Sequence, residues 1–190
     1  MATVGIDRAK VEANVLAAAE GDQDAFDWLV ECYGRLVWSV IRSHGLSDAD
    51  AHDAFQTTWL RLVEHLDRIR EPRAVGGWLA STSRHESLRL LRHADRARPT
   101  PEERFEQIED AAETVDHDLI VAERDTQLWD ALNELGERCR TLLRVLMADP
   151  PLSYEEVSQA LDIPIGSIGP TRGRCLGQLR EHLRTRGITG

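Results

Sequence analysis

Cysteine is scarce and scattered in this sequence. Cys32, Cys139 and Cys175 are its only three thiols, and none of them forms a CxxC pair. Such spacing argues against a disulfide framework and against a zinc site. The seven histidines are equally scattered, so we predict no metal and no cofactor. The thiols are expected to be reduced, with Cys175 packed in a core rather than acting as a redox sensor.

Long apolar runs and catalytic motifs are missing as well. No stretch approaches the ~20 apolar residues that a bilayer span requires, and the opening MATVGIDRAK lacks the apolar segment of a secretion signal. We therefore expect a cytoplasmic protein without membrane insertion. No glycine-rich phosphate loop, nucleophile elbow or metal-spaced His/Cys set occurs. These absences predict a protein that is not an enzyme and has no small-molecule substrate.

The net charge of −10 conceals two basic islands. Residues 68–98 carry a net charge of +5 and residues 165–190 carry +4, whereas residues 99–125 between them carry −8. Local charge decides where a nucleic acid can touch a protein. The two islands are therefore candidate nucleic-acid surfaces in an otherwise acidic chain.

Apolar residues recur at intervals of three and four along the chain, and no long strand-like alternation occurs. The spacing predicts helices at about 23–43, 47–65, 74–96, 128–135, 138–148, 153–161 and 167–183. Gly45 is expected to end the first helix in a left-handed conformation, and the S-x-x-E motif of Ser153 and Glu156 predicts a capping box. Pro99 and Pro101 open an acidic segment too poor in apolar residues to fold. The expected fold is all-α, with two small helical domains joined by an acidic flexible linker.

The last two predicted helices form a helix-turn-helix pattern. The stretch ALNELGERCRTLLRVLMADPPLSYEEVSQALDIPIGSIGPTRGRCLGQLREHL resembles the promoter-recognising domain of extracytoplasmic-function (ECF) sigma factors. The stretches GDQDAFDWLVECYGRLVWSVI, DADAHDAFQTTWLRLVEHLDRI and GGWLASTSRHESLRLLRH are similar, in that order, to the N-terminal domain of the same family. The resemblance covers about residues 10–97 and 124–185.

This resemblance implies an alternative sigma factor that binds core RNA polymerase, directs it to specific promoters and helps to open the DNA. It assigns core binding and minus-ten recognition to residues 8–97, which form sigma region 2. It assigns a linker to residues 98–123, and minus-thirty-five recognition by the region 4 helix-turn-helix to residues 124–186. Members of the family are commonly restrained by an anti-sigma factor, which makes such a protein a further expected partner. The regulon, the promoter sequence and the inducing signal do not follow from these residues.

One stripe of the helix predicted at 74–96 is basic and carries an aromatic ring. At 100° per residue, its members fall within about 60° of one another: Trp78, His85, Arg89, Arg92 and Arg96. Basic groups neutralise phosphates and aromatic rings stack on unpaired bases, and the resemblance implies that this stripe binds the minus-ten element. Without the resemblance, a solvated basic face is an equal alternative. The family usually has Asn at position 85 and Asp at position 89, which leaves the promoter preference open.

Glu86 lies on the apolar side of the same helix. An unpaired buried carboxylate is costly, so Glu86 needs a partner, for which we suggest Arg84.

The resemblance also assigns core-polymerase binding to the helix predicted at 47–65. The residues it implicates are Asp53, Gln56, Trp59, Leu60 and Glu64. The core stripe of this helix is expected to include Phe55, Leu62 and Val63, which leaves Leu60 exposed among polar groups, as suits a protein interface. A plain surface helix is the alternative.

The minus-thirty-five site is expected at the start of the last helix and of the helix before it. The candidate residues are Ser153, Tyr154, Ser167, Gly169, Pro170, Thr171, Arg174 and Gln178. Arg174 can reach a guanine edge, and Gln178 or Thr171 a base or a phosphate. Pro170 is expected in the first helical turn, where proline is tolerated, and Arg172 falls on the core side of the wheel.

Two other classes of function compete with this interpretation. A polymerase-independent helix-turn-helix regulator would bind DNA tightly by itself as a two-fold dimer, which a net charge of −10 disfavours. An enzyme would need a catalytic constellation. The paired carboxylates Glu102-Glu103 and Glu155-Glu156 fall in the linker and the capping box, and do not supply one.

Overall fold

A computed structural model of the chain describes residues 7–97 and 127–187, and within these ranges the regular structure is helical. The N-terminal half contains α1 (Arg8–Ala19), α2 (Gln23–Arg42), α3 (Asp48–His65) and α4 (Val75–Ala97), with two 3-10 turns, η1 (Leu66–Arg68) and η2 (Pro72–Ala74), before α4. A helical segment at 127–133 opens the C-terminal half. It is followed by α6 (Glu137–Leu146), α7 (Tyr154–Leu161) and α8 (Ile165–Thr185). The all-α prediction is confirmed.

Side-chain caps fix where several helices begin. Asp7, Asp22 and Ser47 accept hydrogen bonds from backbone N–H groups in the first turns of α1, α2 and α3, which satisfies donors that the helix cannot satisfy itself. Ser153 and Glu156 form the predicted reciprocal capping box of α7. Gly45, at φ +68°, takes the left-handed conformation expected after α2.

Helix α1 was not among the helices predicted from apolar spacing. It buries Val11, Val15 and Ala18 against α2, but three apolar side chains in an alanine-rich segment give a faint pattern. The helix is held by packing rather than by its own periodicity.

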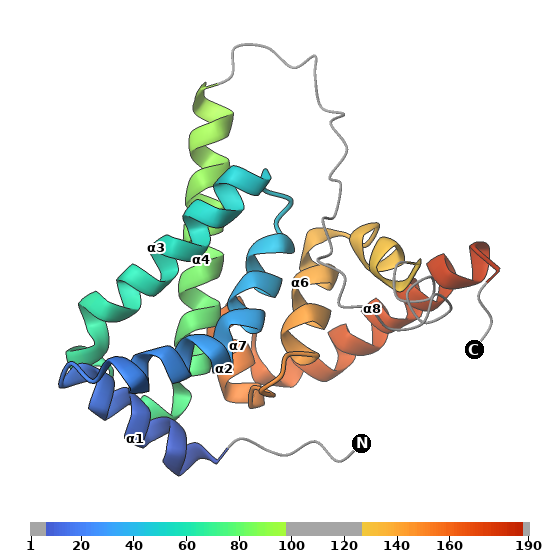
Figure 1. Cartoon of the computed structure of the whole chain (residues 1–190). Helices are drawn as coiled ribbons and strands as arrows, with labels where there is room; N and C mark the ends of the chain where they lie inside the picture. Colours follow the sequence, from blue (N-terminus) through green and yellow to red (C-terminus); the bar gives the residue numbers. More distant parts are fainter. Residues whose placement is uncertain (1–6, 98–126, 188–190) are drawn as a thin grey trace, which may run out of the picture.

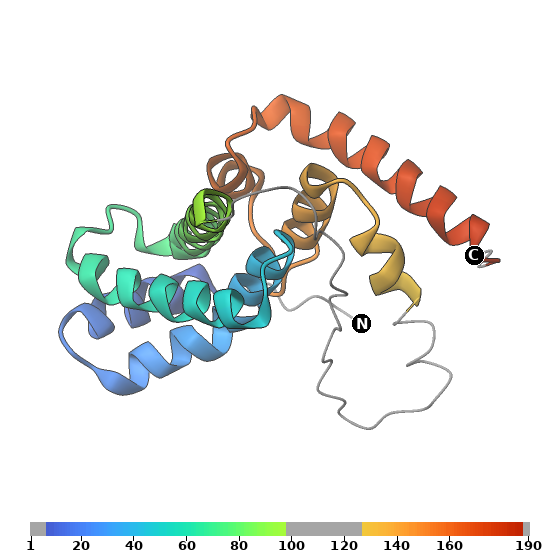
Figure 2. The same cartoon turned by 90° about the horizontal axis from the view of Figure 1, so that it is seen from above.

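The long helix α4 lies at the centre of the molecule (Figures 1 and 2). It packs against α2 and α3 on one side and against α7 on the other. Helix α6 packs against α2, and α8 covers α6 and α7. The two halves of the chain therefore form one body.

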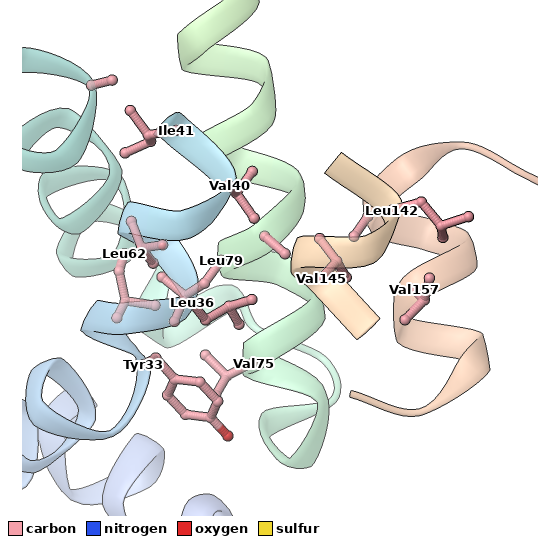
Figure 3. Close-up of a cluster of buried hydrophobic side chains, with 14 of the residues drawn as sticks. Tyr33, Leu36, Val40, Ile41, Leu62, Val75, Leu79, Leu142, Val145 and Val157 are labelled. Atoms are coloured by element: carbon pink, nitrogen blue, oxygen red, sulfur yellow. The ribbon is translucent and has the colours of Figure 1, made fainter. Parts of the chain in front are cut away.

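One apolar core runs through both halves (Figure 3). Leu36 and Val40 of α2 and Leu79 of α4 lie next to Val145 of α6. Val157 of α7 continues the same cluster. Burying such a side chain contributes roughly 1.5–3 kcal/mol to the stability of the fold. Because the cluster contains residues of both halves, the contact between the halves is part of the hydrophobic core.

Two adjacent glycines let α4 and α7 approach closely. A Cβ atom on Gly77 would lie 2.9 Å from the Glu156 Cβ and 3.2 Å from its Cα, and a Cβ on Gly76 would lie 2.9 Å from Leu152 Cδ2. Atoms do not pack at such distances, so a side chain at Gly77 would push α7 away from α4.

Polar contacts link the halves around this apolar centre. The Ser43 and Thr141 hydroxyl oxygens lie 2.8 Å apart in a buried position, and Arg140 Nε donates to the Ser43 carbonyl at 2.7 Å. Arg8 pairs with Glu156 at 2.9 Å. His44 contacts Glu137 at 2.8 Å, and burial lowers the pKa of His44 although Glu137 acts to raise it.

The structure corrects the expectation for the cysteines. Cys139 of α6 and Cys175 of α8 form a disulfide, with their Cα atoms 5.2 Å apart. Their separation of 36 residues hid the pair in the sequence, because only the packing of α6 on α8 brings them together. Cys175 is buried, as expected. Cys32 remains a thiol, and burial raises its pKa to about 11, so it is protonated at neutral pH.

We predict that the protein with the Cys139–Cys175 bond intact resists alkylation at two of its three cysteines.

A cross-link over 36 residues stabilises the folded state by roughly 4 kcal/mol in the chain-entropy model. Cys139→Ser is therefore expected to lower the free energy of unfolding of the C-terminal helices by about 3–4 kcal/mol, measured by urea denaturation without reductant. Cys32→Ser is the control and should leave the cross-link intact. Alkylation of all three thiols in unreduced, unfolded protein would show that the bond is absent.

Candidate nucleic-acid and polymerase interfaces

Helices α7 and α8 form a helix-turn-helix. Asp162 ends α7 in a left-handed conformation at φ 54°, and Ser158 Oγ donates to the Ile163 carbonyl at 2.6 Å, which closes the turn. Helix α8 begins at Ile165, two residues before the predicted start. The predicted motif is confirmed in its geometry.

The exposed face of α8 holds four of the eight residues proposed for minus-thirty-five recognition. It consists of Gly169, Pro170, Arg172, Gly173, Arg174, Gly177 and Gln178. Nothing lies within 4 Å of where a Cβ would stand on Gly169, Gly173 or Gly177, so this face leaves room for another backbone to approach. Ser153 and Ser167 are half-buried at the starts of α7 and α8, and Tyr154 is exposed.

Three residues of α8 differ from the helical-wheel expectation. Thr171 is only 5% exposed, because it points with Ile168 and Cys175 toward α6 and α7, so it does not belong to the exposed face. Arg172 is exposed rather than on the core side, since the buried side of α8 is shifted toward Thr171. Pro170 lies inside the helix, beyond the first turn. Because proline has no N–H, it cannot donate the helical hydrogen bond to the carbonyl of Gly166.

The basic stripe of α4 is exposed at its C-terminal end. His85, Arg89 and Arg92 are exposed and Trp78 is half-buried, while the side chain of Arg96 lies outside the described residues. The face therefore presents imidazole and guanidinium groups to solvent, with an aromatic ring at one end, as the sequence indicated.

Trp78 also borders a pocket of about 390 Å³ that sequence patterns did not reveal. Its other lining residues include His65, Arg68, Arg70 and Ser81. The His65 and Trp78 ring centroids are 6.0 Å apart. Turn η1 and the segment after it supply the basic groups, so only the folded loop shows that they surround Trp78. An aromatic wall with basic residues at the rim suits an unpaired base.

Glu86 is paired, but not with Arg84. Its carboxylate accepts from Arg89 Nε at 2.6 Å and lies 3.7 Å from Arg61 Nε. The suggested partner was wrong because residue 89 follows 86 by nearly one helical turn and α3 brings Arg61 alongside. Arg89 therefore has a structural role in addition to its place on the basic stripe.

The exposed face of α3 matches the predicted polymerase-binding set with one exception. Asp53, Gln56 and Glu64 are exposed, and Leu60 is 58% exposed. Trp59 is buried and stacks edge-on against Phe26 and Phe55, so it supports the helix from inside.

Val63 was expected in the core of α3 but is 53% exposed. It adds a second apolar side chain close to Leu60, since positions three apart on a helix are neighbours.

The structure does not bear on the linker that the sequence predicts. Residues 98–123 lie outside the described residues. None of the helices in the described ranges is long and apolar enough to cross a membrane, and the same ranges contain no group of three His, Cys, Asp or Glu side chains arranged to hold a metal ion.

The fold and its surfaces define an all-helical protein of two packed halves, a four-helix half with a basic stripe on α4 and a helix-turn-helix half, each with a candidate nucleic-acid surface. Comparison with known proteins makes this specific. Residues 29–97 match the family model for Sigma-70 region 2. The chain is 30% identical over 139 residues to the RNA polymerase sigma-E factor of Streptomyces avermitilis, covering 73% of this chain and 74% of that protein. It is 26% identical over 192 residues to the ECF RNA polymerase sigma factor SigC of Mycobacterium tuberculosis, covering 100% of both.

The chain belongs to the RNA polymerase sigma factors of the ECF type. A solved structure of CnrH in complex with the cytosolic domain of CnrY shares the fold, with a TM-score of 0.64 and 19% identity, over 93% of this chain and 98% of that chain.

We predict that Arg89→Ala destabilises the protein and Arg92→Ala does not. Removal of Arg89 leaves the nearly buried Glu86 carboxylate with only the distant Arg61, at a cost of roughly 1–3 kcal/mol. Arg92 contacts only the Leu88 carbonyl of its own helix among the bonds observed here. Urea unfolding of both variants measures the difference. Equal losses would show that the contact between Arg89 and Glu86 contributes nothing particular.

Proposed function

We propose that this chain binds core RNA polymerase, directs it to specific promoters and helps to separate the DNA strands, and that it catalyses no reaction itself. The observation that carries the proposal is the presence on one chain of two different exposed surfaces that suit nucleic acid. Helix α4 offers a basic stripe that leads to an aromatic pocket, which suits unpaired bases. Helix α8 offers a recognition face on a helix-turn-helix, which suits the major groove of a duplex.

Residues 8–97 are the proposed region 2 domain. The exposed groups at His85, Arg89 and Arg92 would contact the phosphates of the minus-ten element, and Trp78 would stack on a base that enters its pocket. Arg96 extends the same stripe in sequence. Strand separation needs a surface that holds unpaired bases, and we assign that role to this pocket.

Residues 124–186 are the proposed region 4 domain, joined to region 2 by a linker at 98–123. Arg174 and Gln178 would reach base edges, while Ser153, Tyr154 and Ser167 would meet phosphates at the starts of α7 and α8. Gly169 and Pro170 let the start of α8 lie close to the DNA. We replace Thr171 in this set with Arg172, because Arg172 is the exposed residue of the two.

The polymerase is proposed to dock on the outer face of α3. Leu60 and Val63 form a small apolar centre, and the exposed polar groups of Asp53, Gln56 and Glu64 surround it, in the arrangement usual for protein interfaces. An anti-sigma factor is a further proposed partner, and the cytoplasm is the proposed site of action.

The test of the whole proposal is transcription from a promoter library by bacterial core RNA polymerase with and without the purified protein. We expect initiation at discrete promoters only when both are present.

Arg92→Ala should impair strand opening, measured by permanganate reactivity of unpaired thymines. Arg174→Ala should weaken binding to duplex promoters, and permanganate reactivity of the promoter complexes that do form should be unchanged. Tight binding of the protein alone to duplex DNA, with no effect of added core, would favour an autonomous regulator instead.

We predict that Leu60→Asp weakens binding to core polymerase at least tenfold, because a charge replaces the apolar centre of the docking face. Leu16→Asp is the matched control, since Leu16 of α1 is 53% exposed but lies on a different surface. Fluorescence anisotropy of labelled protein titrated with core measures both affinities. Similar affinities for the two variants would place the docking surface away from α3.

A further inference from the structure

A cavity of about 830 Å³ lies beside the contact between α2 and α6, away from both proposed DNA surfaces. Its walls come from α2, from the start of α3, from the helical segment at 127–133, and from the end of α6 with the residues that follow it. None of its lining residues belongs to α4, α7 or α8. Small-molecule sites have volumes of roughly 300–1,000 Å³, so the cavity is large enough for a ligand that contains a ring system.

Each half of the chain supplies one indole ring to this cavity. Trp38 of α2 is half-buried and lies edge-on to His52, with the ring centroids 5.1 Å apart. Trp129 of the other half is 44% exposed, and Met147, which lines the same cavity, is 64% exposed. Large apolar side chains that meet water together at one recess are typical of a ligand site rather than of plain surface.

The same walls carry an excess of positive charge, although the net charge of the chain is −10. Three arginines, Arg35, Arg42 and Arg144, line the cavity against two aspartates, Asp48 and Asp149. Arg42 pairs with Asp48 at 2.6 Å, so that carboxylate is already engaged within the wall. The remaining excess of one guanidinium group favours an anionic ligand.

Two of these guanidinium groups lie against the indole rings. The Arg144 guanidinium is 5.1 Å from the ring centroid of Trp129, and that of Arg42 is 5.9 Å from the ring centroid of Trp38. Arg144 also donates to Asn133 Oδ1 at 2.8 Å, which fixes its position in the absence of a ligand. Cationic groups and aromatic rings are therefore presented side by side, as a ligand with both a planar ring and a phosphate requires.

We propose that this cavity binds a free nucleoside phosphate, with its base against the indole rings of Trp38 and Trp129 and its phosphate groups on Arg35 and Arg144. A purely apolar ligand would leave the positive charge of the cavity unbalanced, and a simple anion would leave the indole rings in water. A nucleotide meets both features. The inference goes beyond the proposed function and does not depend on it, because none of these residues belongs to the proposed DNA or polymerase surfaces.

Isothermal titration calorimetry of the full chain with ATP and with GTP tests the proposal. We expect at least one of the two nucleotides to bind with a Kd of about 100 µM or lower. Inorganic triphosphate and the matching nucleoside should each bind more weakly by roughly tenfold or more, because each of them meets only one part of the cavity.

Trp129→Ala and Arg35→Gln are each expected to weaken nucleotide binding by roughly tenfold or more. Both side chains are exposed, so neither change removes a core group. Trp28→Ala is the matched control for the indole, because Trp28 is half-buried and lies under the Lys10 ammonium at 4.9 Å, but does not line the cavity. Arg180→Gln, at an exposed position of α8, is the control for the guanidinium. Both controls should bind the nucleotide as the wild type does.

Thermal unfolding without nucleotide checks that each variant is folded, and Arg35→Gln decides the matter if Trp129→Ala is not. A Kd above about 1 mM for both nucleotides would overturn the proposal. Equal affinities for inorganic triphosphate and the nucleotide would also overturn it, since charge alone would then explain binding, as would equal losses in the variants and their controls. Tighter binding of a single-stranded oligonucleotide, lost in Trp129→Ala, would overturn it as well, because the cavity would then hold a strand and not a free nucleotide.

Discussion

The close packing of α4 against α7 is the constraint on which the rest of the structure depends. Because Gly77 presents no side chain, the backbone of α7 lies against the central helix and a single apolar core passes from one half to the other. The partial cover of the Trp78 pocket and the position of the recognition helix both follow from this contact. The two halves of the chain thus share one hydrophobic core.

The sequence predicted the helices, the α7 capping box and the exposed face of α3 because these depend on local spacing. An apolar stripe with a spacing of three and four residues indicates which side of a helix is buried, and an S-x-x-E motif indicates where a helix begins; neither requires knowledge of the packing partner. The prediction of buried and exposed side chains failed where the neighbouring helices decide which side of a helix is covered. Thr171 is buried and Arg172 is exposed because the buried side of α8 is shifted toward Thr171 by the helices that pack on it, which a wheel without those partners does not show, and Val63 lost its expected burial for a similar reason.

Contacts between residues distant in sequence were beyond such patterns. The Cys139–Cys175 disulfide and the pairing of Glu86 with Arg61 require two helices to lie side by side, which periodicity within one helix does not specify. The glycine pair at 76–77 is plain in the sequence, but the sequence did not predict that it allows close helix packing. A glycine within a helix has this role only where a neighbouring segment occupies the space beside it. The packing of the two halves was therefore the part of the fold least accessible from sequence.

The open surroundings of Gly169, Gly173 and Gly177 bear on how such a protein can change over evolutionary time. Since no neighbouring atom occupies the space where their side chains would begin, substitutions there leave the core of the C-terminal helices intact, and most would strengthen α8 by removing a poor helix former. The residues proposed to contact DNA are thus separated from the residues that hold the fold. Under the proposed function, single substitutions at these positions change promoter preference without loss of folding, so that duplicated copies of the gene can acquire different sets of target promoters.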